Sequence, residues 1–241
     1  MIKFFRNIRQ NLLNEGKTSK YLKYAIGEVF LVMIGILLAL QVNNWNEARK
    51  ISNLEIDILK ELKNNLDSDL IDIDENIGWH TQSENSSQII TKVIDNKLSY
   101  NDSLDYHFSS IYVFPMFVPT LTAYETIKQN GTRLIKNDSL RFRIVGLYER
   151  DHSFLNDVMN NERQQTSKDL HGLYRKEFNS FDWFGKTHPA NFNRLLENEE
   201  YYNYVQFKKA LSKYMIDLYN WLKEDIEIIK NLINEELERR K

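Results

Sequence analysis

The histidines and acids are the residues in this chain whose types could support chemistry. Glu149 to His152 read Glu-Arg-Asp-His, which is one Glu-x-x-His motif. Di-iron helical bundles need two such motifs and two further carboxylates on facing helices. The sequence has no second copy, and no two of its five histidines have the i, i+4 spacing of a zinc-binding helix. We therefore interpret the motif as a surface ion cluster and expect no metal, cofactor or catalytic residue.

Several acids lie close together between Asp67 and Glu75, a pattern that can indicate a calcium site. An EF-type loop needs a glycine and a terminal glutamate, whereas these acids alternate with Leu66, Leu70 and Ile73 at helical spacing. We expect them to form the solvated face of a helix. Nucleophile-elbow, phosphate-loop and dinucleotide-loop motifs are also absent from the sequence, and we expect a non-enzymatic protein.

The composition argues against further classes of function. The 241 residues include 32 basic and 34 acidic side chains, a balance that gives no charge excess for binding nucleic acid. Cysteine is absent, so the chain has no disulfide, no thiolate metal ligand and no thiol nucleophile. Eight glycines and three prolines leave long stretches without a helix breaker, which favours long helices.

The most apolar stretch of the chain is residues 24–44, whose central part, Val29 to Leu40, contains no polar side chain. A helix of this length, at about 1.5 Å per residue, matches a hydrocarbon core of about 30 Å. Tyr21 and Tyr24 at one end and Trp45 at the other are placed as interfacial anchors. We predict a single transmembrane helix. The alternatives are the buried core helix of a soluble protein and a cleaved signal peptide, which the long preceding segment disfavours.

The charges on either side of this stretch predict its orientation. Residues 1–23 carry six basic side chains against one acid, whereas residues 45–241 carry more acids than bases. Because basic flanks stay in the cytoplasm, we predict a cytoplasmic N-terminus in the inner membrane and a periplasmic C-terminal domain in a Gram-negative cell. Segment 1–23 either lies on the anionic leaflet as an amphipathic helix or acts only as a basic flank.

Small residues lie on one face of the predicted transmembrane helix. Gly27, Gly35 and Ala39 recur at intervals of eight and four, and Gly35 and Ala39 form a small-xxx-small pair that lets two helices approach closely. Glu28 borders this face about one turn inside the span, where a carboxylate is costly unless it reaches the interface or a partner. The face predicts a homodimer or docking against another membrane protein, and the alternative is a lipid-facing helix.

Two stretches of the chain resemble a known family. They are Tyr24 to Glu28, Ile34 to Ile36 and Ala39 to Glu47 in the first, and Tyr124 to Lys128, Gly131, Leu134, Ile135, Asn137, Leu140, Tyr148 and Glu149 in the second. These residues are similar to domain of unknown function 6090, a family of bacterial single-pass membrane proteins. The resemblance implies a membrane location and no known reaction.

Residues 45–241 predict an all-α domain. Apolar residues recur every three or four positions from Ile51 to Ile77 and from Tyr204 to Leu237, which indicates two long amphipathic helices. We expect the transmembrane helix to continue outward into the first of them, within an antiparallel bundle. Their mean spacing of about 3.7 residues predicts nearly straight helices. Shorter helices are expected at about 80–97, 120–129, 138–177 and 189–197, with a turn at Asn130-Gly131 and an N-cap at Asn137.

One apolar and aromatic segment, Ile111 to Pro119, contains two prolines that exclude an ordinary helix interior. It is either a connecting loop that covers the core or the wall of a ligand pocket or partner-binding lip. The residues of that pocket or lip would be Tyr112, Phe114, Pro115, Phe117 and Pro119.

These features lead to one main hypothesis and one alternative. The main hypothesis is a membrane-anchored periplasmic helical domain that contacts the lipid bilayer and acts through protein partners, without catalysis. The alternative is a ligand-sensing domain that relays its state to a partner membrane protein, because only a short segment would face the cytoplasm.

Overall fold

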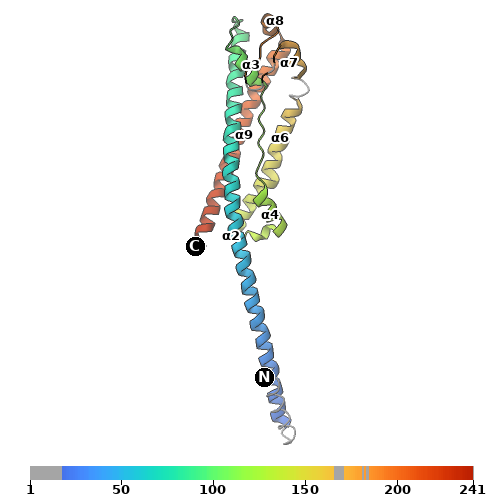
Figure 1. Ribbon diagram of the computed structural model, residues 1–241, viewed down its shortest axis with the longest axis vertical. Coiled ribbons are helices and arrows are strands. Elements are labelled where there is room, and N and C mark those ends of the chain that lie inside the picture. The colour runs from blue at the N-terminus through green and yellow to red at the C-terminus, as the bar shows by residue number, and fades with distance from the viewer. Residues whose placement is uncertain (1–17, 166–170, 181, 183–184, 241) are drawn as a thin grey trace. The chain divides into compact units, whose positions relative to one another are not determined.

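The computed structural model describes residues 18–165, 171–180, 182 and 185–240, and this part of the chain is all-helical (Figure 1). Its elements are α2 (Thr18–Asp95), α3 (Leu104–Tyr112), α4 (Thr122–Asn130), the 3-10 turn η1 (Thr132–Leu134), α5 (Asp138–Val145), the π-helical turn η2 (Gly146–Asp151), α6 (His152–Gln165), α7 (His171–Glu177), α8 (Phe192–Leu196) and α9 (Glu199–Glu238). The predicted all-α fold class is confirmed for these residues.

The chain divides into two compact units, Met1–Glu55 and Ile56–Lys241, which we call the N-terminal unit and the C-terminal unit. The described residues of the N-terminal unit belong to α2. Most of the predicted basic segment 1–23 lies outside the described residues.

The C-terminal unit has two separate clusters of buried apolar side chains. The lower cluster takes its residues from α2, α4, η1, α5, η2, α6 and α9, together with Phe117 and Ile135. The upper cluster takes its residues from α2, α3, α7, α8 and α9, together with Phe178. Both α2 and α9 contribute to both clusters, so these two helices connect them.

Helices α2 and α9 lie side by side in the C-terminal unit (Figure 1). The polar contacts that join them include Asp67 to Lys230 at 2.8 Å, Asp74 to Lys223 at 2.5 Å and Gln206 to Thr91 at 2.8 Å. Each step forward along α2 between these contacts matches an equal step backward along α9. The two helices therefore keep one register from the lower cluster to the upper one.

The buried positions of α9 alternate four and three residues apart along the helix. They are Tyr201, Val205, Lys208, Ser212, Met215, Tyr219, Leu222, Ile226, Ile229, Ile233 and Glu236. This is a seven-residue repeat with a mean spacing of about 3.5 residues, so the predicted spacing of about 3.7 is wrong for α9. The prediction counted Phe207, which is exposed, and missed Lys208 and Ser212, which are polar but buried.

Some predicted helix boundaries are confirmed and others are wrong. The helix expected at 120–129 is α4, and the one expected at 189–197 is the shorter α8. No separate helix begins at residue 80, because α2 continues through Gly78 to Asp95. One interior glycine costs only about 1 kcal/mol, which the packing of a long helix offsets. The helix expected at 138–177 is divided into α5, η2, α6 and α7, and residues 166–170 lie outside the described ones.

The first two apolar residues of the predicted α2 stripe are not part of the core. Ile51 is 46% exposed and Leu54 is 38% exposed, and both belong to the N-terminal unit. The stripe is buried from Ile58 to Ile73. The periodicity was therefore a reliable sign of a helix, but it did not locate where burial begins.

Candidate functional site

The predicted packing face of the apolar stretch is exposed in this chain. A Cβ atom added at Gly27 or Gly35 would meet no other atom within 4 Å. Ala39 is exposed and Glu28 is half-buried. The structure therefore leaves room beside both glycines and does not test the predicted helix pairing.

The predicted interfacial anchors lie on α2 at either end of the apolar stretch. Tyr24 is 51% exposed and Trp45 is 65% exposed. The side chain of Tyr21 lies outside the described residues. Large aromatic side chains with this exposure suit a membrane interface, and their role as anchors stays a prediction.

The segment from Ile111 to Pro119 connects the two apolar clusters. Tyr112 ends α3 and is buried in the upper cluster, whereas Phe117 is buried in the lower one. Phe114 and Pro115, which lie between Tyr112 and Phe117 in the sequence, are half-buried, and so is Pro119. None of the described pockets is lined by these residues, so their role as a pocket or lip stays a prediction.

Two acids of α2 fix the end of this segment. Asp72 accepts a hydrogen bond from the backbone N–H of Val118 at 3.1 Å, and Asp69 accepts one from Thr120 at 2.8 Å. Asp69 is only 1% exposed, and burial raises the pKa of its carboxyl group. The prediction that these acids form a solvated face is therefore wrong for Asp69. Its carboxylate accepts a hydrogen bond from the backbone of a loop residue, Thr120, whose N–H would otherwise need another acceptor.

The second stretch that resembles the family forms a compact cluster on α4 and η2. The rings of Tyr124 and Tyr148 stack at a centroid distance of 4.3 Å. The Tyr124 hydroxyl donates to Glu149 at 2.8 Å, and Lys128 pairs with the same carboxylate at 2.9 Å. These bonds hold the pKa of Glu149 below its usual value, so the cluster joins α4 to the π-helical turn.

The Glu-x-x-His motif does not converge on one point. Glu149 is directed to Tyr124 and Lys128, while Asp151 is buried and accepts from Arg150 at 2.6 Å. His152 is buried against the rings of Tyr148 and Phe117, and burial lowers the pKa of His152 to about 4. Among the described residues, no group of three or more histidine and acidic side chains could hold a metal ion.

A layer of buried polar residues separates the two apolar clusters. It comprises Asn76, His80, Ser83, Ser86 and Ser87 of α2, Glu162 of α6, and Lys208 and Ser212 of α9. Lys208 donates to Glu162 at 2.8 Å, and their side chains are 1% and 3% exposed. An ion pair this deeply buried is costly to desolvate and holds together only while both partners are present.

His80 lies beside this ion pair and inside α2, whereas the sequence predicted that a helix would begin near residue 80. Its ring is 5.8 Å from that of Tyr219, centroid to centroid. Burial, with Lys208 nearby, lowers the pKa of His80 to about 3, so the ring is neutral near pH 7. Neither ring nitrogen, nor the hydroxyl groups of Ser83 and Ser212, makes a hydrogen bond to another described group.

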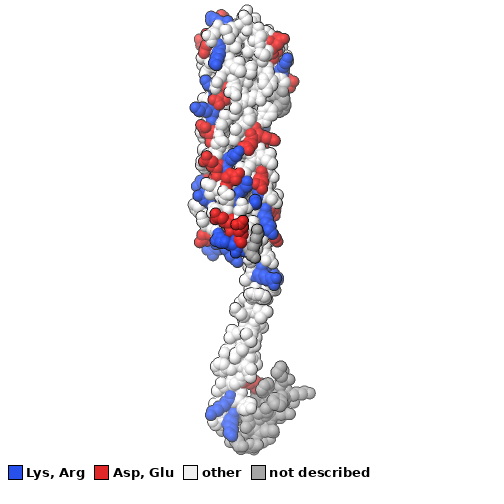
Figure 2. All heavy atoms as spheres, turned by 90° about the vertical axis from the view of Figure 1, so that its left-hand side faces the viewer, with Lys and Arg blue, Asp and Glu red and all other residues white. Residues whose placement is uncertain are grey.

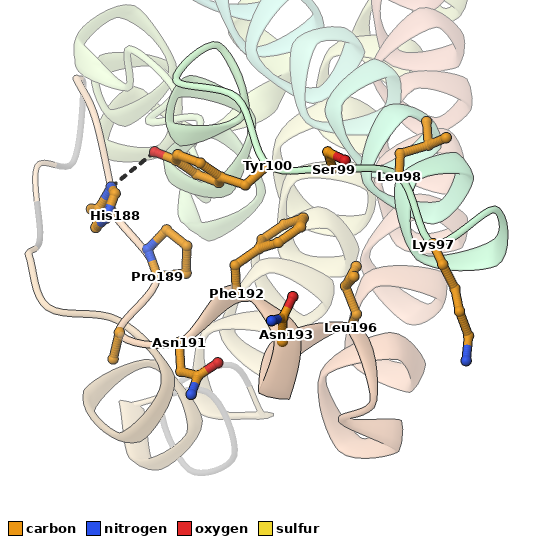
Figure 3. Close-up of a pocket in the computed structure, with 11 residues that line it drawn as sticks. Lys97, Leu98, Ser99, Tyr100, His188, Pro189, Asn191, Phe192, Asn193 and Leu196 are labelled. Atoms are coloured by element: carbon orange, nitrogen blue, oxygen red, sulfur yellow. Dashed lines mark hydrogen bonds between the residues drawn. The ribbon is translucent and has the colours of Figure 1, made fainter.

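A surface pocket of about 440 Å³ lies where α2 ends and α8 begins (Figure 3). The Tyr100 hydroxyl donates to Asp105 at 2.9 Å and is also 2.9 Å from Nδ1 of His188. Burial and the bond to Asp105 raise the pKa of Tyr100, so its hydroxyl keeps its proton. Phe192 and Asn193 complete a wall that offers an aromatic face and amide groups to a small polar ligand.

Sequence reasoning missed both the polar layer and this pocket. His188 is 88 residues from Tyr100 and 83 from Asp105, so no spacing rule connects it with them. The polar layer does carry a signal, because His80, Ser83, Ser87, Lys208 and Ser212 all occupy seam positions of a seven-residue repeat. The signal is visible only when polar residues, and not just apolar ones, are counted as members of the seven-residue repeat.

One comparison with known proteins gives a match, to a protein family. The model of a family of unknown function, DUF6090, matches residues 28–184, well over half of the chain. No curated protein and no solved structure matches. The match includes the Tyr124, Lys128, Tyr148 and Glu149 cluster described above, and the chain therefore belongs to the DUF6090 family.

Proposed function

We propose that this protein is a single-pass membrane protein whose helical domain lies outside the cytoplasm and acts by binding other proteins. The N-terminus would be cytoplasmic, residues 24–44 would cross the inner membrane, and the rest would form an antiparallel helical bundle in the periplasm. The apolar stretch of α2 carries this proposal.

Among the described residues, one helix is long and apolar enough to cross a membrane. It contains an 18-residue window with a mean hydropathy of 2.3, and no part of that window is buried. Figure 2 displays this stretch as a surface almost free of charged side chains. A helix that is apolar on all sides needs cover from protein or lipid, and a lipid bilayer supplies that cover for a stretch of this length. A signal sequence would show the same composition, so the anchor needs a direct test.

The C-terminal unit supports a binding role through its surface and its rigidity. Figure 2 displays positive and negative side chains interspersed on one face of this unit, which suits a soluble domain rather than a membrane-embedded one. The register between α2 and α9 and the cluster around Tyr124 hold its helices together. A rigid scaffold of this kind presents fixed surfaces to partners.

Reporter fusions test the topology. Alkaline phosphatase and a fluorescent protein that folds only in the cytoplasm are each fused after Lys241 in full-length protein. We expect phosphatase activity without fluorescence. The phosphatase fusion should be recovered in the membrane fraction as an uncleaved product. Fluorescence without phosphatase activity would place the domain in the cytoplasm, and a shortened product in the soluble fraction would identify a cleaved signal sequence.

A ligand-sensing role is the second candidate, and the pocket beside Tyr100 favours it. The pocket offers a hydroxyl group, an imidazole and an aromatic face on elements of the upper cluster. Thermal unfolding of the purified full-length protein is measured against pools of small polar compounds. A stabilising compound whose effect is lost in Tyr100→Phe would support sensing, while an equal shift in both proteins would locate binding elsewhere.

A further inference from the structure

Helix α9 has an apolar column on its exposed side in addition to its buried seam. Phe207, Tyr214, Trp221 and Ile228 follow one another at intervals of seven residues. They are 46%, 46%, 44% and 43% exposed, which is high for such large side chains. Large apolar residues repeated every seven positions are the pattern by which one helix packs along another. We call these four residues the α9 column.

The two sides of the α9 column differ in charge: one is acidic, and the other holds an Arg143–Asp225 ion pair. On a helix, residues three and four positions away flank a given residue on opposite sides. Asp217 and Glu224, both exposed, therefore border the column on one side. Asp225 borders it on the other side, where Arg143 of α5 donates to it at 2.9 Å and remains 40% exposed.

We propose that the α9 column binds the α9 column of a second copy of this chain, with the two helices parallel. A two-fold axis along parallel helices brings the acidic side of one column against the Arg143 side of the other. A two-fold axis across antiparallel helices would bring acidic side against acidic side. Glu224 and Asp225 are adjacent along α9, so Glu224 of one copy meets Arg143 of the second copy at the same height.

The parallel arrangement agrees with the proposed membrane anchor, and to that extent the inference rests on the proposed function. Two copies held in one membrane have the same orientation, so their α9 helices can align in parallel without either chain turning over. The α9 column lies in the C-terminal unit and is separate from the small-residue face predicted for the apolar stretch. It therefore adds a contact surface outside the membrane.

The size of the α9 column predicts a weak contact that tethering strengthens. Large apolar side chains bury about 150–250 Å² each, so four that are a little under half exposed contribute on the order of 350 Å² per chain. Stable complexes bury about 1,200–2,000 Å² in total. A pair of columns buries about 700 Å² in total, which is below that range. Confinement to one membrane raises the effective concentration of the two copies and supports so small a contact.

Disulfide cross-linking in the full-length protein is the direct test, because the chain contains no cysteine. Tyr214→Cys and Trp221→Cys are oxidised with copper phenanthroline, since equivalent seam residues of a parallel pair come within disulfide reach. Asn220→Cys is the matched control, because Asn220 is exposed but lies on a different side of α9. We expect a covalent dimer from both column variants and none from the control.

Three results would overturn the proposal. They are the loss of the dimer from both column variants while their thiols still react with maleimide, an equal yield from the control, and a cross-linked product with a different protein. Each sample is separated into membrane and soluble fractions before the gel. Recovery in the soluble fraction counts against the anchor, whereas membrane-bound protein without a dimer counts against the α9 column.

Charge reversal tests the parallel register. Glu224→Arg in the Trp221→Cys protein places two positive groups together, and we expect loss of the dimer. Adding Arg143→Glu restores the opposite charges and should restore the dimer, while Glu75→Arg on the exposed face of α2 should change nothing. Thermal unfolding of each variant is recorded. If the variant with both Glu224→Arg and Arg143→Glu is destabilised, the register is judged from Glu224→Arg alone. An undiminished dimer in Glu224→Arg, or no recovery in a stable double variant, would overturn the register.

Discussion

Lys208 and Glu162 stabilise each other at 2.8 Å where neither can reach water. Removing one partner leaves the other charge buried, so we expect Lys208→Met to lower the free energy of unfolding by about 3–5 kcal/mol. Replacing both, as Lys208→Met with Glu162→Leu, should recover most of that loss because no charge remains to be desolvated. Urea unfolding of the detergent-solubilised protein, followed by far-UV circular dichroism, measures both. A double variant no more stable than the single one would contradict this account.

His80 makes the stability of the protein depend on pH. Burial lowers its pKa to about 3 in the folded protein, whereas an unfolded chain has a histidine pKa of about 6.5. The unfolded chain therefore binds the proton more readily, and the contribution of His80 is complete above pH 6.5 and is lost as the pH falls toward 3. His152, with a pKa lowered to about 4, acts in the same direction.

We therefore expect the Tm to fall between pH 7 and pH 5, and to fall less in His80→Leu. The leucine variant lacks the titrating ring and also removes two buried nitrogens that make no hydrogen bond to a described group. Equal decreases in the unaltered protein and in His80→Leu would show that other groups cause the pH dependence.

Two glycines in the helical elements have opposite roles. Gly78 lies inside α2, and a Cβ atom there would meet nothing within 4 Å, so we expect Gly78→Ala to stabilise the protein by about 0.4–1 kcal/mol. Gly131 follows α4 with a φ of +86°, a conformation that side chains disfavour, so Gly131→Ala should destabilise it. Urea unfolding measures both variants, and a destabilising Gly78→Ala would indicate a function for that glycine beyond the helix.

Local signals in the sequence predicted several elements well. Asn137 caps α5 by accepting from the N–H of Leu140 at 3.1 Å, and the Asn130-Gly131 turn ends α4, both as expected. Such signals depend on neighbouring residues alone. The polar seam residues of α9 and the buried Asp69 depend on partners far along the chain. Their polar side chains predicted exposure, but tertiary packing buries them.

At the scale of the whole molecule, the C-terminal unit has its own core. Every residue of its two apolar clusters lies at or after Ile58. We therefore expect a chain that starts at Ile56 to fold and remain in solution without the apolar stretch. Far-UV circular dichroism and a cooperative thermal transition would check this. Aggregation of residues 56–241, with a folded full-length protein as the control, would show that the unit needs its anchor.

The polar layer between the two apolar clusters has a consequence for how the molecule opens. Apolar contacts that spread through one continuous core make a domain unfold as a single block. This layer instead contains a buried ion pair and several polar groups that make no hydrogen bond to another described group, so it couples its two sides weakly. The end of the unit that contains α3, α7 and α8 can then unfold locally while the lower cluster stays intact. A protein built this way has two levels of stability along one pair of long helices.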